Sequence, residues 1–530
     1  MKLSQAGAFT ASLLGSSLVF AHPTGGPLEL PATTACFESA VTAGRASGAL
    51  SGIAAAVVLD GRIVYRRGFG TVSPSSSQAV LPTTRFRIAS LNKVMTSTAL
   101  LSLAEEHRLP LHAPVTYFLP GLSLSGEPGW TESLTPHLLL SHQGALFDRL
   151  TINGPRDDGA LRAAFYDPAY TSTVPFTVAP GTFYNYANPN FMLAGLVAEE
   201  AAGRPYREVM RRRVFKPLGM TRAVFLPSEV LADNDFAYGV RNARAIAPGD
   251  YDNAIERPAG FAWTSAEDLA KFAQFILRGN PAALSPRMWR LLQSPKVNTY
   301  QFLDRQSYAY GLIVQNGVFL PDGNRQVQFY DGVKLVGHDG ALPGYKSLMM
   351  TLPRQGFGYV AMVNGDAPVP ATDLFACYQV AATETVGNRL PAPSPPPDPQ
   401  IQRDRFGDYV GTFDDRTGIG GSYVLSLTPT GDLSIFLPQF PTFQYNPILL
   451  PTSRDNFLFL TQAGAIPITG FRGEGNAVLH LRTRPFVWTR GEEGTTALRS
   501  AAAPANVEEF SRALREAALE QDGSLRWTAP

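Results

Sequence analysis

The sequence predicts a mixed α and β chain that ends in a separate antiparallel β domain. Three observations predict it. Residues 52–65 form two β-rich runs joined by Asp60-Gly61, a dipeptide typical of a hairpin turn. Residues 85–106 contain no Gly or Pro and have apolar residues at helical spacing. Residues 391–400 form a proline-rich linker, and short β-rich runs separated by Gly, Pro and Asp turns follow it to about residue 490.

The length and composition indicate a folded, multidomain chain. It has 530 residues, of which 45% are hydrophobic and 17% charged, so a sizeable core can form and global disorder is excluded. The formal net charge of +1 argues against a nucleic-acid-binding or polybasic membrane surface. Between the first hairpin and the linker, residues 326–364 are expected to form antiparallel strands, and residues 366–386 a helix.

The first 21 residues are typical of a secretory signal peptide. A lysine is followed by a short run of apolar and small residues and by Val19-Phe20-Ala21, which fits a cleavage site after Ala21. A membrane anchor is the alternative, but the run is short for a span. We therefore expect a secreted, extracellular protein, or a periplasmic one in a bacterium. In such a compartment Cys36 and Cys377 can form a disulfide, whereas in a reducing compartment they would be buried thiols.

Ser90 and Lys93 form an S-x-x-K motif at the start of the helix predicted for residues 85–106. Positions i and i+3 share a helix face, so the amine can lie beside the hydroxyl and activate it as a nucleophile. The alternative is a surface serine and lysine on one turn. Two observations favour the functional interpretation: Lys93 lies among apolar residues, and no other lysine has a serine three positions before it.

Two further runs contain candidate site residues. Tyr186 and Asn188 follow a Pro-Gly turn and precede an apolar helix, so they are predicted on a loop that enters that helix. Their alternative roles are a packed tyrosine and a capping asparagine. His338 lies in the small-residue run GHDGA, residues 337–341, where a ligand can approach a strand edge closely. A lone histidine can equally be structural.

Together, Ser90-x-x-Lys93, Tyr186-x-Asn188 and His338-x-Gly340 resemble the penicillin-recognising serine hydrolases. This group includes class C β-lactamases, DD-peptidases, D-aminopeptidases and related esterases and transesterases. The flanking segments LLLSHQGAL, PGTFYNYANPNFMLAGLV, PAGFAWTSAEDLAKF and GHDGALPGYKSLMMTLP are similar too, and the resemblance covers residues 51–386.

The resemblance implies an α/β sandwich, with a central antiparallel sheet, helices on its faces and an inserted helical lobe. It also implies that the first and last helices of this fold pack together, so that Cys36 and Cys377 form a disulfide. The expected organisation is a signal peptide (1–21), a β-lactamase-like hydrolase domain (22–390), a linker (391–400), a β-barrel domain resembling lipocalin-like extensions (401–499) and a tail (500–530).

The resemblance also implies a role for each site residue. Ser90 is the nucleophile and forms an acyl-enzyme, and Tyr186 is the general base, as a phenolate that the charge of Lys93 stabilises. Asn188 contacts Lys93 or the substrate carbonyl. The backbone N–H groups of Ser90 and Ala341 form the oxyanion hole. Neither a metal nor an organic cofactor is expected.

The departure from the family pattern is His338, where typical β-lactamases and DD-peptidases have lysine. Histidine is mostly neutral at pH 7, so the site requires an anionic substrate less strongly. Asp339 and Gly340 are expected beside the substrate, with Asp339 orienting the imidazole. We therefore expect an esterase or transesterase acting on small or medium acyl substrates, with no nucleic acid, membrane span or protein partner. The alternatives are a D-aminopeptidase, DD-peptidase or β-lactamase, or a non-catalytic ligand-binding pseudoenzyme.

Overall fold

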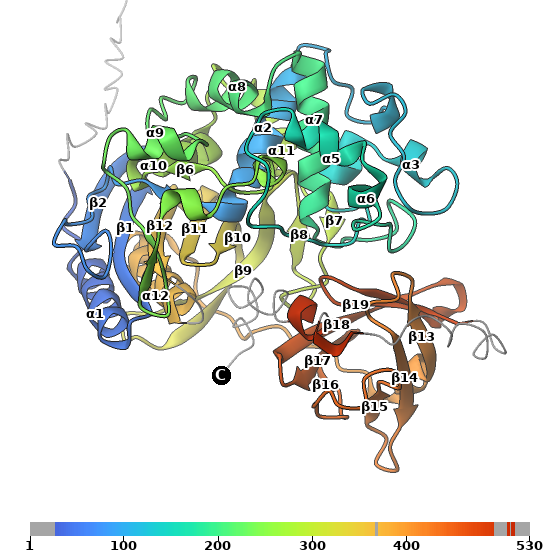
Figure 1. The fold of residues 1–530 in the computed structure, drawn as a ribbon. Coiled ribbons are helices and arrows are strands. Elements are labelled where there is room, and N and C mark those ends of the chain that lie inside the picture. Colours follow the sequence, from blue (N-terminus) through green and yellow to red (C-terminus); the bar gives the residue numbers. More distant parts are fainter. Residues whose placement is uncertain (1–26, 366–368, 492–505, 509, 515–530) are drawn as a thin grey trace, which may run out of the picture.

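The computed structural model describes residues 27–365, 369–491, 506–508 and 510–514 (Figure 1). The signal peptide expected for residues 1–21 and most of the tail expected for residues 500–530 lie outside these ranges. No helix among the described residues is long and apolar enough to cross a membrane.

The first sheet is antiparallel and has eight strands, built from both ends of the N-terminal unit, which we define as residues 27–390. Its spatial order is β2 (Arg62–Gly70), β1 (Leu50–Leu59), β12 (Phe357–Gly365), β11 (Tyr345–Leu352), β10 (Val327–Leu342), β9 (Ile313–Pro321), β8 (Gln306–Tyr308) and β7 (Val297–Asn298). The hairpin turn between β1 and β2 is Asp60-Gly61, and both residues have positive φ (49° and 75°). That conformation matches the right-handed twist of the paired strands.

Helices cover both faces of this sheet. Strand β1 is buried on both sides: Ile53, Ala55 and Val57 pack with α1 and α12, while Ala54, Ala56 and Val58 belong to the core shared with α2, α7 and α10. The helices are α1 (Pro31–Ser47), α2 (Asn92–Glu105), α3 (Trp130–Ser133), α4 (Pro136–Leu140), α5 (Ala160–Phe165), α6 (Pro168–Thr171), α7 (Asn188–Ala202), α8 (Tyr206–Met210), α9 (Pro227–Leu231), α10 (Ala266–Arg278), α11 (Pro286–Gln293) and α12 (Val369–Val386). In Figure 1, α2, α3 and α5–α8 form a lobe above the sheet, inserted between β3 (Phe86–Arg87) and β6 (Trp263–Thr264).

A disulfide joins Cys36 of α1 to Cys377 of α12, the pair implied by the resemblance. Their Cα atoms are 5.6 Å apart and 341 positions separate them in the sequence. Closing so long a loop restricts the unfolded chain and contributes roughly 2–4 kcal/mol of stability.

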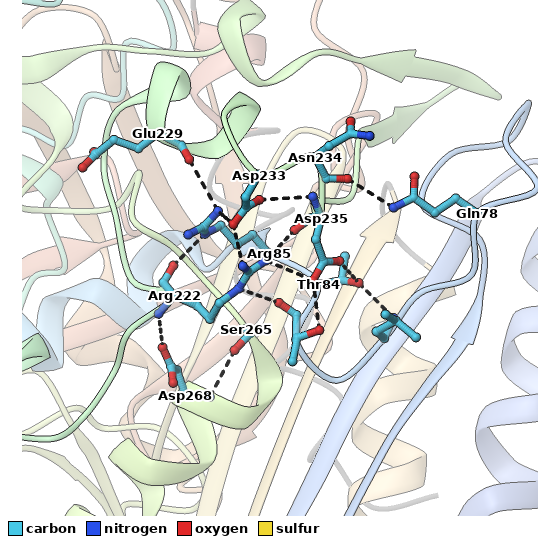
Figure 2. A network of polar contacts seen from close by, with 12 residues as sticks. Gln78, Thr84, Arg85, Arg222, Glu229, Asp233, Asn234, Asp235, Ser265 and Asp268 are labelled. Carbon is cyan, nitrogen blue, oxygen red and sulfur yellow. Dashed lines mark hydrogen bonds and ion pairs between the residues drawn. The ribbon is translucent and has the colours of Figure 1, made fainter.

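The segment before Ser90 is anchored by a network of ion pairs (Figure 2). Residues 85–106, expected as one helix, instead begin with β3, and α2 starts only at Asn92. Arg85 is buried and pairs with Asp233, which also pairs with Arg222. The same Arg222 binds Asp235 at 3.0 Å. The network therefore ties β3 to the end of the inserted lobe.

The second sheet forms the C-terminal unit, which we define as residues 401–491. Its eight antiparallel strands run in the order β15 (Leu433–Phe436), β14 (Ser422–Leu427), β13 (Gly411–Asp415), β20 (Val487–Arg490), β19 (Val478–Arg482), β18 (Gly464–Arg472), β17 (Asn456–Thr461) and β16 (Leu450–Ser453). The sheet curls on itself, because Ile435 N donates to Pro447 O and Leu449 N to Leu433 O (2.8 and 3.0 Å) just before β16. The domain limits 22–390 and 401–499 stay a prediction, and the strands of each sheet fall within them.

The two units share aromatic contacts. Phe183 stacks on Phe471 with ring centroids 4.0 Å apart, and Phe147 packs against Phe486 at 5.7 Å. Phe147 thereby joins the hydrophobic core of the C-terminal unit. The linker is also attached, since Ser394 N donates to Phe329 O of β10 at 2.9 Å. Figure 1 shows β18 and β19 on the side of the second sheet that faces the first.

Candidate active site

Ser90 lies in a 3-10 turn, Ala89–Leu91, that leads directly into α2. The preceding residue, Ala89, has a left-handed φ of 46°. This conformation is costly for a residue with a side chain and occurs often at functional sites. It is held by its neighbours: Ile88 N donates to Ala262 O at 3.0 Å, and Ile88 O accepts from Ser347 Oγ at 2.7 Å. Ser90 itself is half-buried.

The small residues of the GHDGA run allow β10 to lie against this turn. A Cβ atom at Gly340 would collide with the carbonyl oxygen of Ile88 and contact Ala89. The absence of that side chain brings Ala341, one residue further along β10, to the rim of the same cavity as Ser90.

Lys93 is fully buried on the first turn of α2 and has three neutral hydrogen-bond partners. Its Nζ donates to Ser90 Oγ at 3.0 Å, to Asn188 Oδ1 at 2.7 Å and to Ala259 O at 2.7 Å. Ser90 and Lys93 therefore share a helix face, as the i, i+3 spacing predicts.

Tyr186 and Asn188 reach the site from the start of α7. Tyr186 precedes the helix, and its hydroxyl donates to Ser90 Oγ at 3.0 Å. Asn188 is the first residue of α7, and Asp148 Oδ1 accepts from both its backbone N (2.7 Å) and its Nδ2 (3.1 Å). This fixes the orientation of the carboxamide, so that its oxygen faces Lys93.

Burial changes the charges expected for these groups. Burial, aided by the charge of Arg484, lowers the pKa of Lys93 to about 7. Burial raises the pKa of Tyr186 well above its ordinary value, and the opposing effect of Arg484 is smaller. Burial thus disfavours the phenolate expected for Tyr186 from the sequence and favours the neutral phenol in the free site. The group poised to exchange a proton near neutral pH is Lys93.

His338 is buried and held at both ring nitrogens. Its Nδ1 donates to the backbone oxygen of Asp339 at 2.5 Å, which leaves Nε2 to accept from the Tyr308 hydroxyl at 3.1 Å. Burial lowers the pKa of His338 below its ordinary value, so the ring is neutral at pH 7. The Asp339 carboxylate lies 4.0 Å from Nδ1, and Asp339 thus orients the ring mainly through its backbone.

Ser90, Tyr186 and His338 line one cavity of about 360 Å³, to which the linker and the C-terminal unit also contribute. Its walls are largely apolar. Lining residues from outside the motifs include Tyr300, Phe302, Leu303, Ile313 and Phe319 of the N-terminal unit, Pro396, Pro397 and Pro399 of the linker, and Leu458, Pro467, Arg482 and Arg484 of the C-terminal unit.

The structure adds four neighbours of the candidate site that the sequence did not reveal. Asp148 supports Asn188, Ala259 O accepts from Lys93, and Tyr308 holds His338. Asp148 follows the segment LLLSHQGAL and Ala259 lies in PAGFAW, both noted for their similarity to the family, but neither pattern indicates a contact. No sequence pattern pointed to Arg484, because it lies in the turn between β19 and β20 of the C-terminal unit.

The chain is similar in sequence to known proteins. The family model described as Beta-lactamase matches residues 37–378. Protein flp of Staphylococcus aureus (strain COL) is 24% identical over 324 residues, which span 60% of this chain and 60% of that protein. Penicillin-binding protein 4 of Amycolatopsis lactamdurans is 25% identical over 362 residues, which span 65% of this chain and 88% of that protein.

Solved structures share the fold of both units. A structure of SurE with D-Leu superposes with a TM-score of 0.63 at 19% identity, covering 87% of this chain and 99% of that one. The octameric penicillin-binding protein homologue from Pyrococcus abyssi gives a TM-score of 0.55 at 21% identity, covering 86% of this chain and all of that one. Because the Beta-lactamase family model matches residues 37–378, more than half of the chain, this chain belongs to the beta-lactamase family.

Proposed function

We propose that the protein is a secreted serine hydrolase that forms an acyl-enzyme on Ser90 and acts as an esterase or transesterase on small or medium acyl substrates. One observation supports this most directly: Ser90 Oγ lies 3.0 Å from both Lys93 Nζ and Tyr186 OH at the edge of a cavity. Secretion is supported by the disulfide between Cys36 and Cys377, because such bonds persist in oxidising compartments.

In this proposal the neutral amine of Lys93 is the general base. Two of its hydrogen-bond positions are taken by Asn188 Oδ1 and Ala259 O, so the lone pair of the neutral amine faces Ser90 Oγ. The amine takes the hydroxyl proton as Oγ attacks the substrate carbonyl carbon. The resulting oxyanion is stabilised by the backbone N–H groups of Ser90 and Ala341.

The tetrahedral intermediate then collapses. The bond to the leaving alkoxide breaks, and the Tyr186 hydroxyl donates its proton to that oxygen. The ammonium of Lys93 then gives the proton that it took from Ser90 to the Tyr186 oxygen, which restores the phenol and the neutral amine. Water or an alcohol next attacks the acyl-enzyme by the reverse route, releasing an acid or a new ester and restoring Ser90.

The substrate class follows from the cavity. Aromatic, aliphatic and proline side chains dominate its walls, which suits an apolar acyl group. His338 is neutral at pH 7, so the position that is lysine in typical β-lactamases supplies no fixed charge here. Both points favour a neutral ester over a β-lactam carboxylate.

A peptidase that acts on D-amino-acid amides or D-peptides is the second candidate. It is favoured by two arginines, Arg482 and Arg484, in the lining of the same cavity, since a guanidinium can bind a substrate carboxylate. A β-lactamase and a non-catalytic binding protein are the remaining alternatives.

The test is intact-mass spectrometry after exposure to a fluorophosphonate, p-nitrophenyl butyrate and a penicillin, with Ser90→Ala as the control. We expect a fluorophosphonate adduct on Ser90 and rapid ester turnover, both lost in Ser90→Ala. A long-lived penicilloyl adduct without ester turnover would favour the peptidase instead. No adduct with any probe would refute the catalytic proposal and leave the binding protein.

A further inference from the structure

The C-terminal unit inserts one hairpin turn into the catalytic machinery. Strands β19 and β20 are joined by a turn in which Thr483 N donates to Phe486 O at 3.0 Å. Phe486 packs on Phe147, and Arg484 Nε donates to Asp148 Oδ2 at 2.9 Å. The turn therefore contacts two successive residues of the N-terminal unit, one by an apolar and one by a charged contact.

Asp148 connects this turn to the nucleophile. Its other oxygen accepts from the backbone N and Nδ2 of Asn188, whose Oδ1 accepts from Lys93 Nζ, which in turn donates to Ser90 Oγ. Both ends of the link between the units are buried: the side chains of Arg484 and Asp148 are 7% and 11% exposed. Charge-assisted hydrogen bonds at such a site are strong and fix geometry.

Arg484 reaches Ser90 by a second route. Its guanidinium carbon lies 4.2 Å from the centre of the Tyr186 ring, and the Tyr186 hydroxyl donates to Ser90 Oγ. A guanidinium over an aromatic face is attractive and limits the freedom of the ring. One side chain of the C-terminal unit thus contacts both branches that end at the nucleophile.

We propose that Arg484 is a positioning residue, through which the C-terminal unit completes the active site by fixing Asn188–Lys93 on one side and Tyr186 on the other. This inference rests on the proposed function, since it assumes that Ser90 is acylated. It gives the C-terminal unit a catalytic purpose beyond stabilising the fold.

The same arginine sets part of the electrostatic environment of Lys93. The charge of Arg484 lowers the pKa of Lys93, whereas the carboxyl groups of Asp148, Glu256 and Asp339 raise it. Removing the guanidinium should therefore leave the amine protonated to a higher pH, in addition to loosening its position.

The molecule contains a matched control in Arg416. This arginine also crosses between the units, pairs with an acid (Glu127) and lies over an aromatic ring, with its guanidinium carbon 4.7 Å from the centre of the Trp130 ring. None of these three residues hydrogen-bonds to the residues that connect Arg484 to Ser90, which are Asp148, Asn188, Lys93 and Tyr186. Arg416→Gln therefore removes an ion pair and an aromatic contact between the units, at side chains that are 38% (Arg416) and 54% (Glu127) exposed, and leaves the active site intact.

The experiment compares the wild type with Arg484→Gln, Arg484→Lys and Arg416→Gln as full-length proteins. The first readout is the rate at which a fluorophosphonate labels Ser90, which needs no knowledge of the natural substrate. We expect a fall of about 10- to 100-fold in Arg484→Gln, because small displacements of catalytic groups have effects of this size. Arg484→Lys should recover part of the rate, and Arg416→Gln should stay within about twofold of the wild type, as expected for a contact outside the site.

Steady-state kinetics with p-nitrophenyl butyrate separate positioning from substrate binding. If Arg484 positions the catalytic groups, we expect kcat to fall in Arg484→Gln while KM stays within about twofold of the wild-type value. Because the pKa of Lys93 should rise when the positive charge is removed, we also expect the fall of kcat/KM at low pH to begin at a higher pH in Arg484→Gln. In Arg484→Lys, which keeps the charge, it should begin at the wild-type pH. Thermal unfolding of each variant checks that it is folded. If Arg484→Gln does not fold, the labelling rates of Arg484→Lys and Arg416→Gln are compared instead. A lower rate in Arg484→Lys than in Arg416→Gln then supports the inference, and equal rates contradict it.

Three outcomes overturn the inference: labelling of Arg484→Gln at the wild-type rate, a rise in KM with kcat kept, or an equal loss in Arg416→Gln. The second would make Arg484 a substrate-binding residue. If the wild type itself is not labelled, the proposed function fails and the inference falls with it. A labelled wild type with an unaffected Arg484→Gln refutes the inference alone.

Discussion

Two buried cations lie close together in the sequence, and their hydrogen-bond partners are of opposite kinds. Arg85 pairs with the carboxylate of Asp233, in a network that also contains Arg222 (Figure 2). Lys93 instead donates to a hydroxyl, a carboxamide oxygen and a backbone carbonyl, and it forms no ion pair within the described part of the chain. Both side chains are almost completely enclosed.

Under the proposed function, the difference distinguishes Arg85, which stabilises the fold, from Lys93, which exchanges a proton with Ser90. Burial lowers the pKa of Arg85, but Asp233 opposes this and guanidinium keeps its proton at any physiological pH. Burial lowers the pKa of Lys93 to about 7, where the amine exchanges its proton readily. Neutral oxygens can hydrogen-bond either form of an amine, whereas a carboxylate partner would favour the charged form. The partners of a buried cation thus indicate whether it holds the fold or takes part in chemistry.

The sharpest way to break this comparison is Lys93→Met, which has the largest expected effect. Removing a general base typically costs about 10²–10⁴ in rate, so we expect Ser90 acylation by p-nitrophenyl butyrate to fall by that factor. The burst of p-nitrophenol measures acylation, and thermal unfolding confirms that the variant is folded. Acylation at more than a tenth of the wild-type rate would show that Lys93 is not the base.

The pH dependence of kcat/KM tests whether Lys93, unlike Arg85, exchanges a proton near neutral pH. Lys93 acts as a base only when it has lost its proton, and its pKa is about 7. We therefore expect kcat/KM to fall about tenfold per pH unit below 7 and to level off above it. Burial lowers the pKa of His338, so its ring stays neutral near pH 7 and its titration should not change kcat/KM there. A profile that is flat from pH 5 to 9, or that rises only near pH 10, would contradict this assignment.

The smallest effect on catalysis is expected for Asp233→Asn in the structural network. It leaves the guanidinium of Arg85, which is 8% exposed, without its carboxylate, while the acid itself is 32% exposed. Breaking a fully buried pair costs about 3–5 kcal/mol, and the partial exposure reduces our expectation to about 1–3 kcal/mol of the free energy of unfolding. Denaturant titration measures this loss. Ser90 labelling per folded molecule should not change, and a loss of labelling would place Arg85 in the active site after all.

The sequence predicted the parts of the site that depend on local geometry or on motif order. Ser90 and Lys93 lie three residues apart on one turn, so any helix brings them together. The hairpin at Asp60-Gly61 follows from turn chemistry in the same way. Tyr186, Asn188 and His338 could be placed only through the resemblance, because nothing in their spacing shows that three distant segments meet.

What the sequence could not give depends on long-range packing and on burial. Asp148 and Arg484 are separated by 336 positions, and neither residue type is unusual where it stands. The raised pKa of Tyr186 was also not evident from the sequence, because it depends on how completely the folded chain excludes water from the hydroxyl. Likewise, the linker was recognised from its prolines, but its place in the cavity wall was not.

The position of the linker in the cavity wall has a consequence for how substrate range can evolve. Pro396, Pro397 and Pro399 line the same cavity as Ser90, and they come from a segment that contains no catalytic group. Linkers and loops tolerate substitution and changes of length far better than packed elements do. Homologues can therefore acquire new substrate ranges by altering this stretch alone, while Ser90 and its partners stay unchanged. Two homologues with identical motifs need not share a substrate, and the linker is the first region in which to look for the difference.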